Sequence, residues 1–353
     1  MIAEEPPYPA FASAVELDQA IDRIAKATFD FRVEFLFGAG MSIDCGVPSG
    51  GELSMDMVRG FFPSPTDRPD DSVVSKLVQQ YPLEAVAEAL QRRPGAGRSD
   101  LTELVRTILL RDGMKPGETH DIFLSICFWD MLPRVKRVFT TNFDDLIERV
   151  FDRKGISIHK KNFASIRDAE RLGRIPIVHL HGMLESEYQL TESDVFRSAY
   201  NPTHALFRSA LAEADAFVMV GYSMTDPDFR SLYMRYREDI QARDPGGMVE
   251  DKTTYVVAPC SDGHAYALGS RIWKSRGAIW IPLSARDFFA KVRLFMEDRS
   301  GRALLSNLRK KLAYGDDEGL NQVVARVADS LCIDQGNALG FLREVRTRSG
   351  SPR

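Results

Sequence analysis

Cysteine is scarce in this chain, and its spacing excludes two kinds of stabilising chemistry. The four cysteines are Cys45, Cys127, Cys260 and Cys332, and none of them forms a Cys-x-x-Cys pair. Such wide spacing argues against a zinc knuckle built from neighbouring residues and against a disulfide framework. We therefore expect reduced thiols and no bound metal.

Long apolar runs and a strong excess of one charge are also missing. No apolar stretch approaches the length of a membrane span, and residues 1–7 lack the basic-then-apolar pattern of a signal peptide. The net charge of −4 gives no electrostatic footprint for nucleic acid, and we interpret the basic cluster 309–311 as a solvated helix face. The sequence predicts a cytoplasmic protein that binds neither membranes nor nucleic acid directly.

Short apolar segments that alternate with helical patterns predict an α/β fold. Buried strands separated by helices are typical of a Rossmann-like, mostly parallel sheet with helices on both faces. A block of helical patterns at about 52–130 is expected to be an insertion between the first two strands. The expected strands are 33–37, 135–140, 175–180, 216–220 and 254–258, with 278–282 as a last candidate.

Two parts of the chain are distinguished by their content of functional residues. Residues 1–284, which include the helical insertion, are expected to form one catalytic domain. Residues 285–353 carry an amphipathic helical pattern and are expected to be a C-terminal extension. This extension either packs against the core or takes part in subunit assembly.

A glycine-rich turn follows the first expected strand. Gly38 and Gly40 remove side chains where a backbone must approach a pyrophosphate, and Ser42 adds a hydroxyl beside N–H groups that we expect to be exposed. The same glycines would also suit a plain tight turn. The pattern by itself therefore indicates a phosphate-binding turn without requiring one.

Glycine or compact polar residues stand at the ends of four expected strands. In an open parallel sheet, ligands bind at the carboxyl ends of the strands, so these residues are expected to meet at one edge. The coincidence of four such ends is harder to attribute to turns than any single one. The segments are Gly38-Ala39-Gly40, Thr141-Asn142-Phe143-Asp144, His181-Gly182 and Gly221-Tyr222-Ser223.

These segments, together with Gly46-Val47-Pro48, resemble the sirtuin family in that family's order, and most closely the sirtuin-like NAD-degrading effectors of bacterial antiphage systems. The resemblance covers roughly residues 33–282 and implies a Rossmann-like NAD site. It implies that Asn142 and Asp144 lie near the nicotinamide ribose and carboxamide, and that His181 is the catalytic base. The residues implied in cofactor binding are Gly38, Ala39, Gly40, Ser42, Pro48, Thr141, Gly221 and Ser223.

The chemistry of the three catalytic candidates agrees with this implication. An amide such as Asn142 can donate and accept at once and could hold a water, while Asp144 could accept from the nicotinamide amide. His181 titrates near neutrality and could take a proton from a ribose hydroxyl or the attacking water. Asn142 could instead be only a turn or helix-capping residue, and His179 is the rival base. Tyr222 could stack on the cofactor or simply close the pocket.

Two departures from deacylating sirtuins favour hydrolysis over acyl transfer. The chain has no zinc module with two cysteine pairs, and Ser49-Gly50-Gly51 stands where those enzymes have an Asp-Phe-Arg element. We expect an NAD⁺ glycohydrolase that yields nicotinamide and ADP-ribose and depletes cellular NAD during phage defence. A noncatalytic module that senses NAD or ADP-ribose and an NAD-dependent protein deacylase are the alternatives. No sensor domain is obvious in the sequence, so we expect activation by assembly, as a homo-oligomer or with a partner subunit. The family resemblance implies a HerA-type ATPase or an Argonaute-like protein as a candidate partner.

Overall fold

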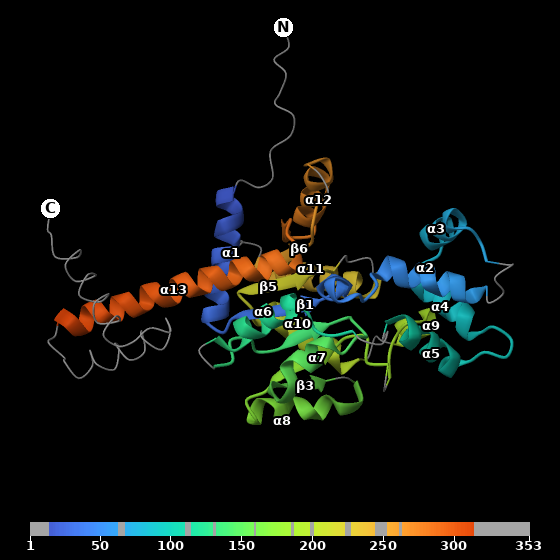
Figure 1. Ribbon diagram of the computed structural model, residues 1–353, viewed down its shortest axis with the longest axis horizontal. Helices are drawn as coiled ribbons and strands as arrows, with labels where there is room; N and C mark the ends of the chain where they lie inside the picture. Colours follow the sequence, from blue (N-terminus) through green and yellow to red (C-terminus); the bar gives the residue numbers. More distant parts are fainter. Residues whose placement is uncertain are drawn as a thin grey trace, which may run out of the picture. The chain divides into compact units, whose positions relative to one another are not determined.

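The computed structural model describes residues 14–62, 68–109, 114–129, 132–158, 160–184, 187–197, 201–222, 227–243, 253–260 and 263–313 (Figure 1). The chain divides into two compact units, Met1–Arg293 and Leu294–Arg353. Within the described part of the chain, no helix is both long and apolar enough to cross a bilayer. All seven strands and the described members of the predicted site belong to the first unit.

Helices and strands alternate along most of that unit. The strands are β1 (Val33–Phe37), β2 (Val138–Thr140), β3 (Gly155–Ile158), β4 (Ile175–His179), β5 (Ala216–Val220), β6 (Thr253–Val257) and β7 (Ala278–Ile281). The helices that precede β2 are α1 (Ala14–Phe29), α2 (Gly50–Phe61), α3 (Asp71–Gln80), α4 (Leu83–Gln91), α5 (Arg98–Leu109) and α6 (Glu118–Cys127). The later ones are α7 (Leu146–Phe151), α8 (Ile166–Arg171), α9 (Glu192–Arg197), α10 (Pro202–Glu213), α11 (Pro227–Arg243), α12 (Gly263–Ser275) and α13 (Ala285–Ala313).

The seven strands form a single parallel sheet in the order β3-β4-β2-β1-β5-β6-β7. The predicted Rossmann-like fold is therefore confirmed, and each expected strand is present, β2 being shorter than predicted. Strand β3 was not predicted. It lies at the edge of the sheet and alternates only two isoleucines with Gly155 and Ser157, too short an apolar pattern to stand out in a sequence.

Strand β1 shows why the sheet is covered on both faces. Its residues are all buried, and successive side chains point to opposite faces. On one face Phe35 and Phe37 pack against Phe123 of α6 and Phe289 of α13, with ring centroids 4.8 to 6.1 Å apart. On the other face Leu36 belongs to a cluster with residues of α10 and α11. The first turns of α13 are therefore part of the core of the first unit.

One charged residue interrupts the apolar run of β1. The side chain of Glu34 is buried and accepts a hydrogen bond from Nε of Arg137 at 3.0 Å, while Arg137 also reaches Glu213 at 3.3 Å. Burial raises the pKa of Glu34 to about 7 despite this pairing. The ion pair connects the starts of β1 and β2, so it fastens the sheet at the end opposite to the predicted site.

The predicted helical insertion comprises α2 to α6, and α2, α3, α4 and α5 gather on one side of the sheet (Figure 1). Helix α2 begins with a capping box in which Ser49 and Glu52 satisfy each other's backbone N–H groups. The insertion has an apolar cluster of its own, built around Met57 and Val105. Tyr188, from the loop after β4, is buried in the same cluster. The insertion therefore packs on a loop of the predicted site.

The strand order reverses at β1, which has β2 on one side and β5 on the other. The turns after β1 and β5 touch each other there through their backbones. The N–H of Gly40 donates to the carbonyl oxygen of Gly221 at 3.0 Å, and a Cβ at Gly221 would lie 2.5 Å from the Gly40 backbone. A Cβ at Gly38 would lie 2.6 Å from the same carbonyl oxygen. Glycine is required at all three positions because two backbones pack directly on one another.

We predict that Gly221→Ala destabilises the fold far more than Gly173→Ala. Both glycines have φ of +63°, but a Cβ at Gly173 would meet nothing within 4 Å. Gly173→Ala should cost about 1 kcal/mol for the left-handed backbone alone, and Gly221→Ala should exceed this by at least about 2 kcal/mol because of the clash. Urea unfolding of the two variants measures the difference. Equal losses would show that the contact between the turns is not rigid.

Candidate functional site

Three predicted residues form a buried polar cluster at the carboxyl end of the sheet. The hydroxyl of Ser42 donates to Oδ1 of Asp144 at 3.2 Å, and Nδ2 of Asn142 donates to Oγ of Ser42 at 3.5 Å. Oδ1 of Asp144 also accepts from the N–H of Leu146 at 3.2 Å, at the start of α7. Ser42 comes from the turn after β1, whereas Asn142 and Asp144 follow β2. Adjacent parallel strands thus bring together residues about a hundred positions apart.

One oxygen of this cluster is buried without a partner. Oδ2 of Asp144 has no hydrogen bond to any described residue, and the side chain is only 5% exposed. Burial raises the pKa of Asp144 from 3.8 to about 6. Unpaired buried acceptors are rare in folded proteins and are commonly satisfied by a bound group. The carboxylate is therefore suited to accept a hydrogen bond from an amide N–H of a ligand.

His181 lies beside this cluster. The N–H of Leu180 donates to the carbonyl oxygen of Thr140 at 2.9 Å, which aligns the ends of β4 and β2. The ring of half-buried His181 meets the ring of Phe143 edge to face, with centroids 6.4 Å apart. Because Phe143 stands between Asn142 and Asp144, this contact brings the histidine to the loop that carries both. The turn after β5 meets the turn after β1 through Gly221 and Gly40, so all four strand ends predicted to converge do so.

The rival base, His179, occupies a different environment. It is the last residue of β4, it is 1% exposed, and its Nε2 lies 2.5 Å from Oε1 of Glu148 on α7. A histidine held in this way inside the protein is a poor partner for a substrate. The geometry favours His181 as the base.

The glycine turn departs from the expectation of exposed N–H groups. The N–H groups of Gly40, Met41 and Ser42 donate to backbone carbonyl oxygens at 3.0 Å, and that of Gly38 does the same to Val220. Ser42 is fully buried, so its hydroxyl serves the cluster with Asp144. The glycines are explained by the contact between the two turns. Ala39 and Gly40 are half-exposed, so a contact between this turn and the cofactor is expected at these two residues.

The other residues predicted to contact the cofactor lie in different environments. Thr141 donates both its N–H and its hydroxyl to the carbonyl oxygen of Phe37, which ties β2 to β1. Gly221 forms the contact between turns described above. The ring of Tyr222 is buried against Phe229, with centroids 4.8 Å apart, which favours a packing role. Ser223 lies outside the described residues.

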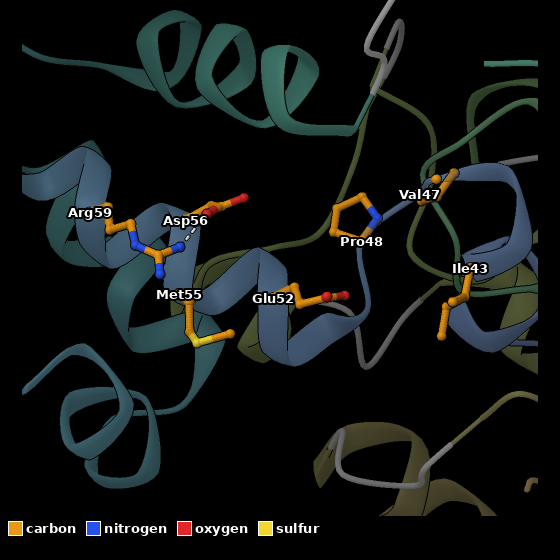
Figure 2. A pocket seen from close by; sticks show the side chains of 8 residues that line it. Ile43, Val47, Pro48, Glu52, Met55, Asp56 and Arg59 are labelled. Atoms are coloured by element: carbon orange, nitrogen blue, oxygen red, sulfur yellow. Dashed lines mark hydrogen bonds and ion pairs between the residues drawn. The ribbon is translucent and has the colours of Figure 1, made fainter. Parts of the chain in front are cut away.

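Pro48 lines a cavity of about 340 Å³ in front of helix α2 (Figure 2). Its polar lining comes from Glu52 and from Asp56, which pairs with Arg59 at 2.7 Å. The remaining lining residues are Ile43, Gly46, Val47 and Met55. Ser42, Asn142 and Asp144 do not line this cavity, although the N–H of Val47, next to Pro48, donates to the carbonyl oxygen of Ser42 at 3.4 Å.

Sequence reasoning missed a second cavity, of about 470 Å³, beside the loop that follows His181. It is lined by Gly182, Tyr188 and Asn201 and by Arg98 and Thr102 of the helical insertion, among others. The sequence held no signal for these contacts, because Arg98 and Tyr188 stand 90 positions apart in the chain. Among the described residues, no group of three or more histidine, cysteine and acidic side chains forms a cluster that could hold a metal.

The structure places the Asn-x-Asp loop and the histidine that carry the sirtuin resemblance at the carboxyl edge of a parallel sheet. Residues 136–281, about two fifths of the chain, match the family described as the SIR2-like domain. The sirtuin resemblance predicted from the motifs is thereby confirmed.

A curated relative is the NAD(+) hydrolase ThsA of Acinetobacter baumannii (strain 532279), 27% identical over 230 residues. The match covers 62% of this chain and 42% of the relative, so this chain spans less than half of that protein. Among solved structures, one from a study of the mechanism and regulation of Sir2 enzymes is 14% identical with a TM-score of 0.42, covering 81% of this chain and 99% of that one. Another, from a study of sirtuin substrate affinity, is 14% identical with a TM-score of 0.38, covering 75% and 93%.

We predict that Asp144→Asn stabilises the protein in a pH-dependent way. Because the folded-state pKa of about 6 lies above the ordinary 3.8, the folded protein binds more protons than the unfolded chain between these values. Wild-type stability is therefore lost as the pH rises through about 6, whereas asparagine stays neutral. The gain of the variant should grow from near zero at pH 4 to the order of 3 kcal/mol at pH 7.

Thermal unfolding of both proteins across this pH range measures the effect. The same change at exposed Asp152, Asp152→Asn, is the matched control and should give a difference from wild type that does not follow this curve. A constant difference between wild type and Asp144→Asn at all pH values would contradict the assignment.

Proposed function

We propose that this protein is an NAD⁺ glycohydrolase, which cleaves NAD⁺ to nicotinamide and ADP-ribose. The observation that carries the proposal is the buried cluster of Ser42, Asn142 and Asp144, with its unpaired carboxylate oxygen, beside His181. The SIR2-like domain and the similarity to a protein named NAD(+) hydrolase support it.

Each residue has a defined task in this reaction. Asp144 accepts a hydrogen bond from the nicotinamide carboxamide at its unpaired oxygen and favours the positive charge that develops on the ribose. Asn142, held by Ser42, positions the attacking water. The glycosidic bond breaks with its electron pair moving to the nicotinamide nitrogen, the water oxygen bonds to the anomeric carbon, and His181 takes the proton that this water releases.

The segment after the glycine turn supports hydrolysis rather than acyl transfer. Ser49 caps α2 and accepts from the N–H of Glu52 at 3.2 Å, and Gly50 and Gly51 form the first exposed turn of the helix. No large side chain from these positions shields the ribose from water. The reactive sugar is then open to water as the acceptor.

The motif resemblance to bacterial antiphage effectors supports a role in defence. In this proposal the protein acts on the cytosolic NAD pool, and its activity is restrained until it assembles. Assembly involves further copies of the chain and a HerA-type ATPase or an Argonaute-like protein. Depletion of NAD then stops the infected cell.

We predict that His181→Ala and Asn142→Ala each lower nicotinamide release by about 10²- to 10⁴-fold, because a general base and a water-positioning group are removed. Chromatography of NAD⁺ reactions with purified protein quantifies nicotinamide and ADP-ribose. Cellular NAD in an expressing host gives a second readout that includes host factors. His179→Gln, which keeps a hydrogen-bonding group toward Glu148, is the control and should lose less than tenfold.

Three results would overturn the proposal. One is undiminished release by both variants, and another is a greater loss in His179→Gln than in His181→Ala. The third is that wild type leaves NAD⁺ intact both as purified protein and in the host. Saturable NAD binding under that last condition would favour a sensing module.

A further inference from the structure

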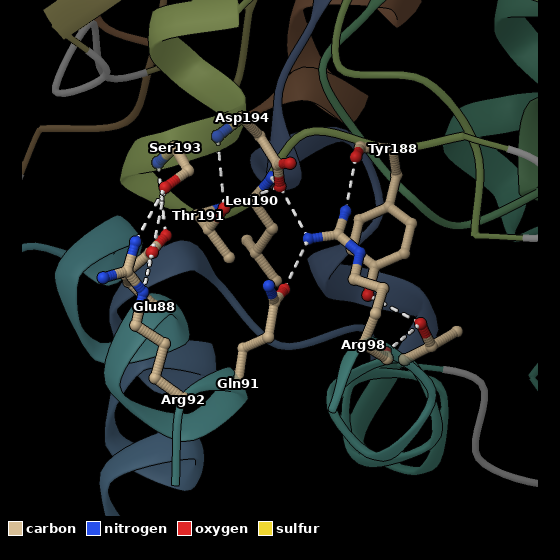
Figure 3. A network of polar contacts seen from close by, with 10 residues as sticks. Glu88, Gln91, Arg92, Arg98, Tyr188, Leu190, Thr191, Ser193 and Asp194 are labelled. Atoms are coloured by element: carbon tan, nitrogen blue, oxygen red, sulfur yellow. Dashed lines mark hydrogen bonds and ion pairs between the residues drawn. The ribbon is translucent and has the colours of Figure 1, made fainter. Parts of the chain in front are cut away.

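One arginine of the helical insertion grips the loop that follows His181. Arg98 opens helix α5, and its guanidinium donates to Oδ2 of Asp194 at 2.6 Å, to the carbonyl oxygen of Tyr188 at 2.5 Å and to Oε1 of Gln91 at 3.1 Å. It also lies 3.9 Å from the centroid of the Tyr188 ring. Figure 3 shows Arg98 between Asp194 and Tyr188. Three of these contacts, with Asp194 and with the backbone and ring of Tyr188, fix the loop to the insertion, while the bond to Gln91 lies within the insertion itself.

Tyr188 is held at both of its ends. Its backbone pairs with Gly182 in an antiparallel bridge, directly after His181 in the chain. Its hydroxyl lies 2.8 Å from Oγ1 of Thr102, one turn along α5 from Arg98. The side chain is 5% exposed. The ring therefore has little freedom to turn.

The other end of the loop is fastened independently. Asp194 accepts from the N–H groups of Leu190 and Thr191 at 3.1 and 3.0 Å. Ser193 donates to Glu88 of α4 at 2.9 Å, and Glu88 pairs with Arg92 at 2.5 Å. Helices α4 and α5 of the insertion thus both hold the segment on which Tyr188 stands (Figure 3).

A chain of aromatic rings leads from this clamp to the proposed base. The ring of Tyr188 meets Phe143 edge to face at 5.9 Å, and Phe143 meets His181 edge to face at 6.4 Å. Such pairs have preferred geometries, so a fixed Tyr188 restricts Phe143 and a fixed Phe143 restricts the imidazole. Asn142 and Asp144, on either side of Phe143, face the buried cluster with Ser42.

We propose that Tyr188, clamped by Arg98 and Thr102, is a positioning residue that sets the orientation of the His181 ring through Phe143. The inference rests on the proposed hydrolase function, in which His181 receives a proton. It gives the helical insertion a specific task, because the two residues that hold Tyr188 both belong to α5. Tyr188 acts through Phe143 and is not itself one of the proposed reacting groups.

The test uses the full chain and a graded set of variants. Tyr188→Leu removes the ring, Tyr188→Phe keeps it and loses only the hydroxyl, and Arg98→Lys keeps the charge but not the forked contact. Arg106→Ala is the matched control, since Arg106 lies on the same helix and forms an exposed pair with Glu103 at 2.9 Å. Nicotinamide release gives kcat and KM, and NMR of the histidine rings follows His181, assigned with His181→Gln.

We expect Tyr188→Leu to lower kcat about tenfold with KM within about twofold, and to change the chemical shift and titration curve of the His181 ring. Tyr188→Phe should stay within about threefold of wild type, Arg98→Lys should fall between the two, and Arg106→Ala should match wild type. Retention of wild-type kcat and His181 signals in Tyr188→Leu would overturn the inference. So would an equal loss in Tyr188→Phe and Tyr188→Leu.

The set of variants also covers two further outcomes, an inactive wild type and a variant that does not fold. If wild type releases no nicotinamide, the hydrolase proposal fails, and the NMR comparison still decides whether Tyr188 sets the His181 ring. If Tyr188→Leu does not fold, Arg98→Lys and Thr102→Val take its place, and unchanged His181 signals in both would overturn the positioning role.

Discussion

The contact between the turns after β1 and β5 is the constraint on which the site depends. Two backbones meet there at a distance that only glycine allows, with the N–H of Gly40 on the carbonyl oxygen of Gly221. This contact fixes the course of the short helical turn Ala39–Met41, and so delivers Ser42 into the interior. There Ser42 meets Asp144 and Asn142 from the neighbouring strand. The polar cluster is thus a consequence of close packing between strands that have no catalytic residue of their own.

The fold could be predicted from the sequence because its signals are local. Apolar segments of strand length, separated by helical periodicity, are enough to predict a parallel sheet and its insertion. The sequence could not show which of two roles the glycines after β1 have. A backbone that approaches a phosphate and a backbone that approaches another backbone both need glycine, so both give the same sequence pattern. Strand β3 was not predicted because four residues with two apolar side chains show too little periodicity.

The residues of the candidate site could be predicted to lie together, but the contacts that hold them in place could not. Asn142, Asp144 and His181 stand at strand ends, so topology alone brings them near one another. That His179 pairs with Glu148 inside the protein follows from the packing of α7, which no spacing reveals. The grip of Arg98 on Tyr188 joins residues 90 positions apart. Phe143 is the clearest example. In the sequence it looks like a spacer between Asn142 and Asp144, yet in the structure its ring contacts the ring of His181, the proposed base.

The ion pair of Glu34 with Arg137 has a consequence for the history of this chain. Removing Glu34 leaves the buried Arg137 with only the more exposed Glu213 as its partner, and removing Arg137 leaves a buried carboxyl without its cation, whereas replacing both by apolar residues is commonly tolerated. A single change at one position therefore passes through a less stable protein. Positions 34 and 137 are expected to have diverged as a unit among descendants of a common ancestor, even though neither one takes part in the chemistry at the other end of the sheet.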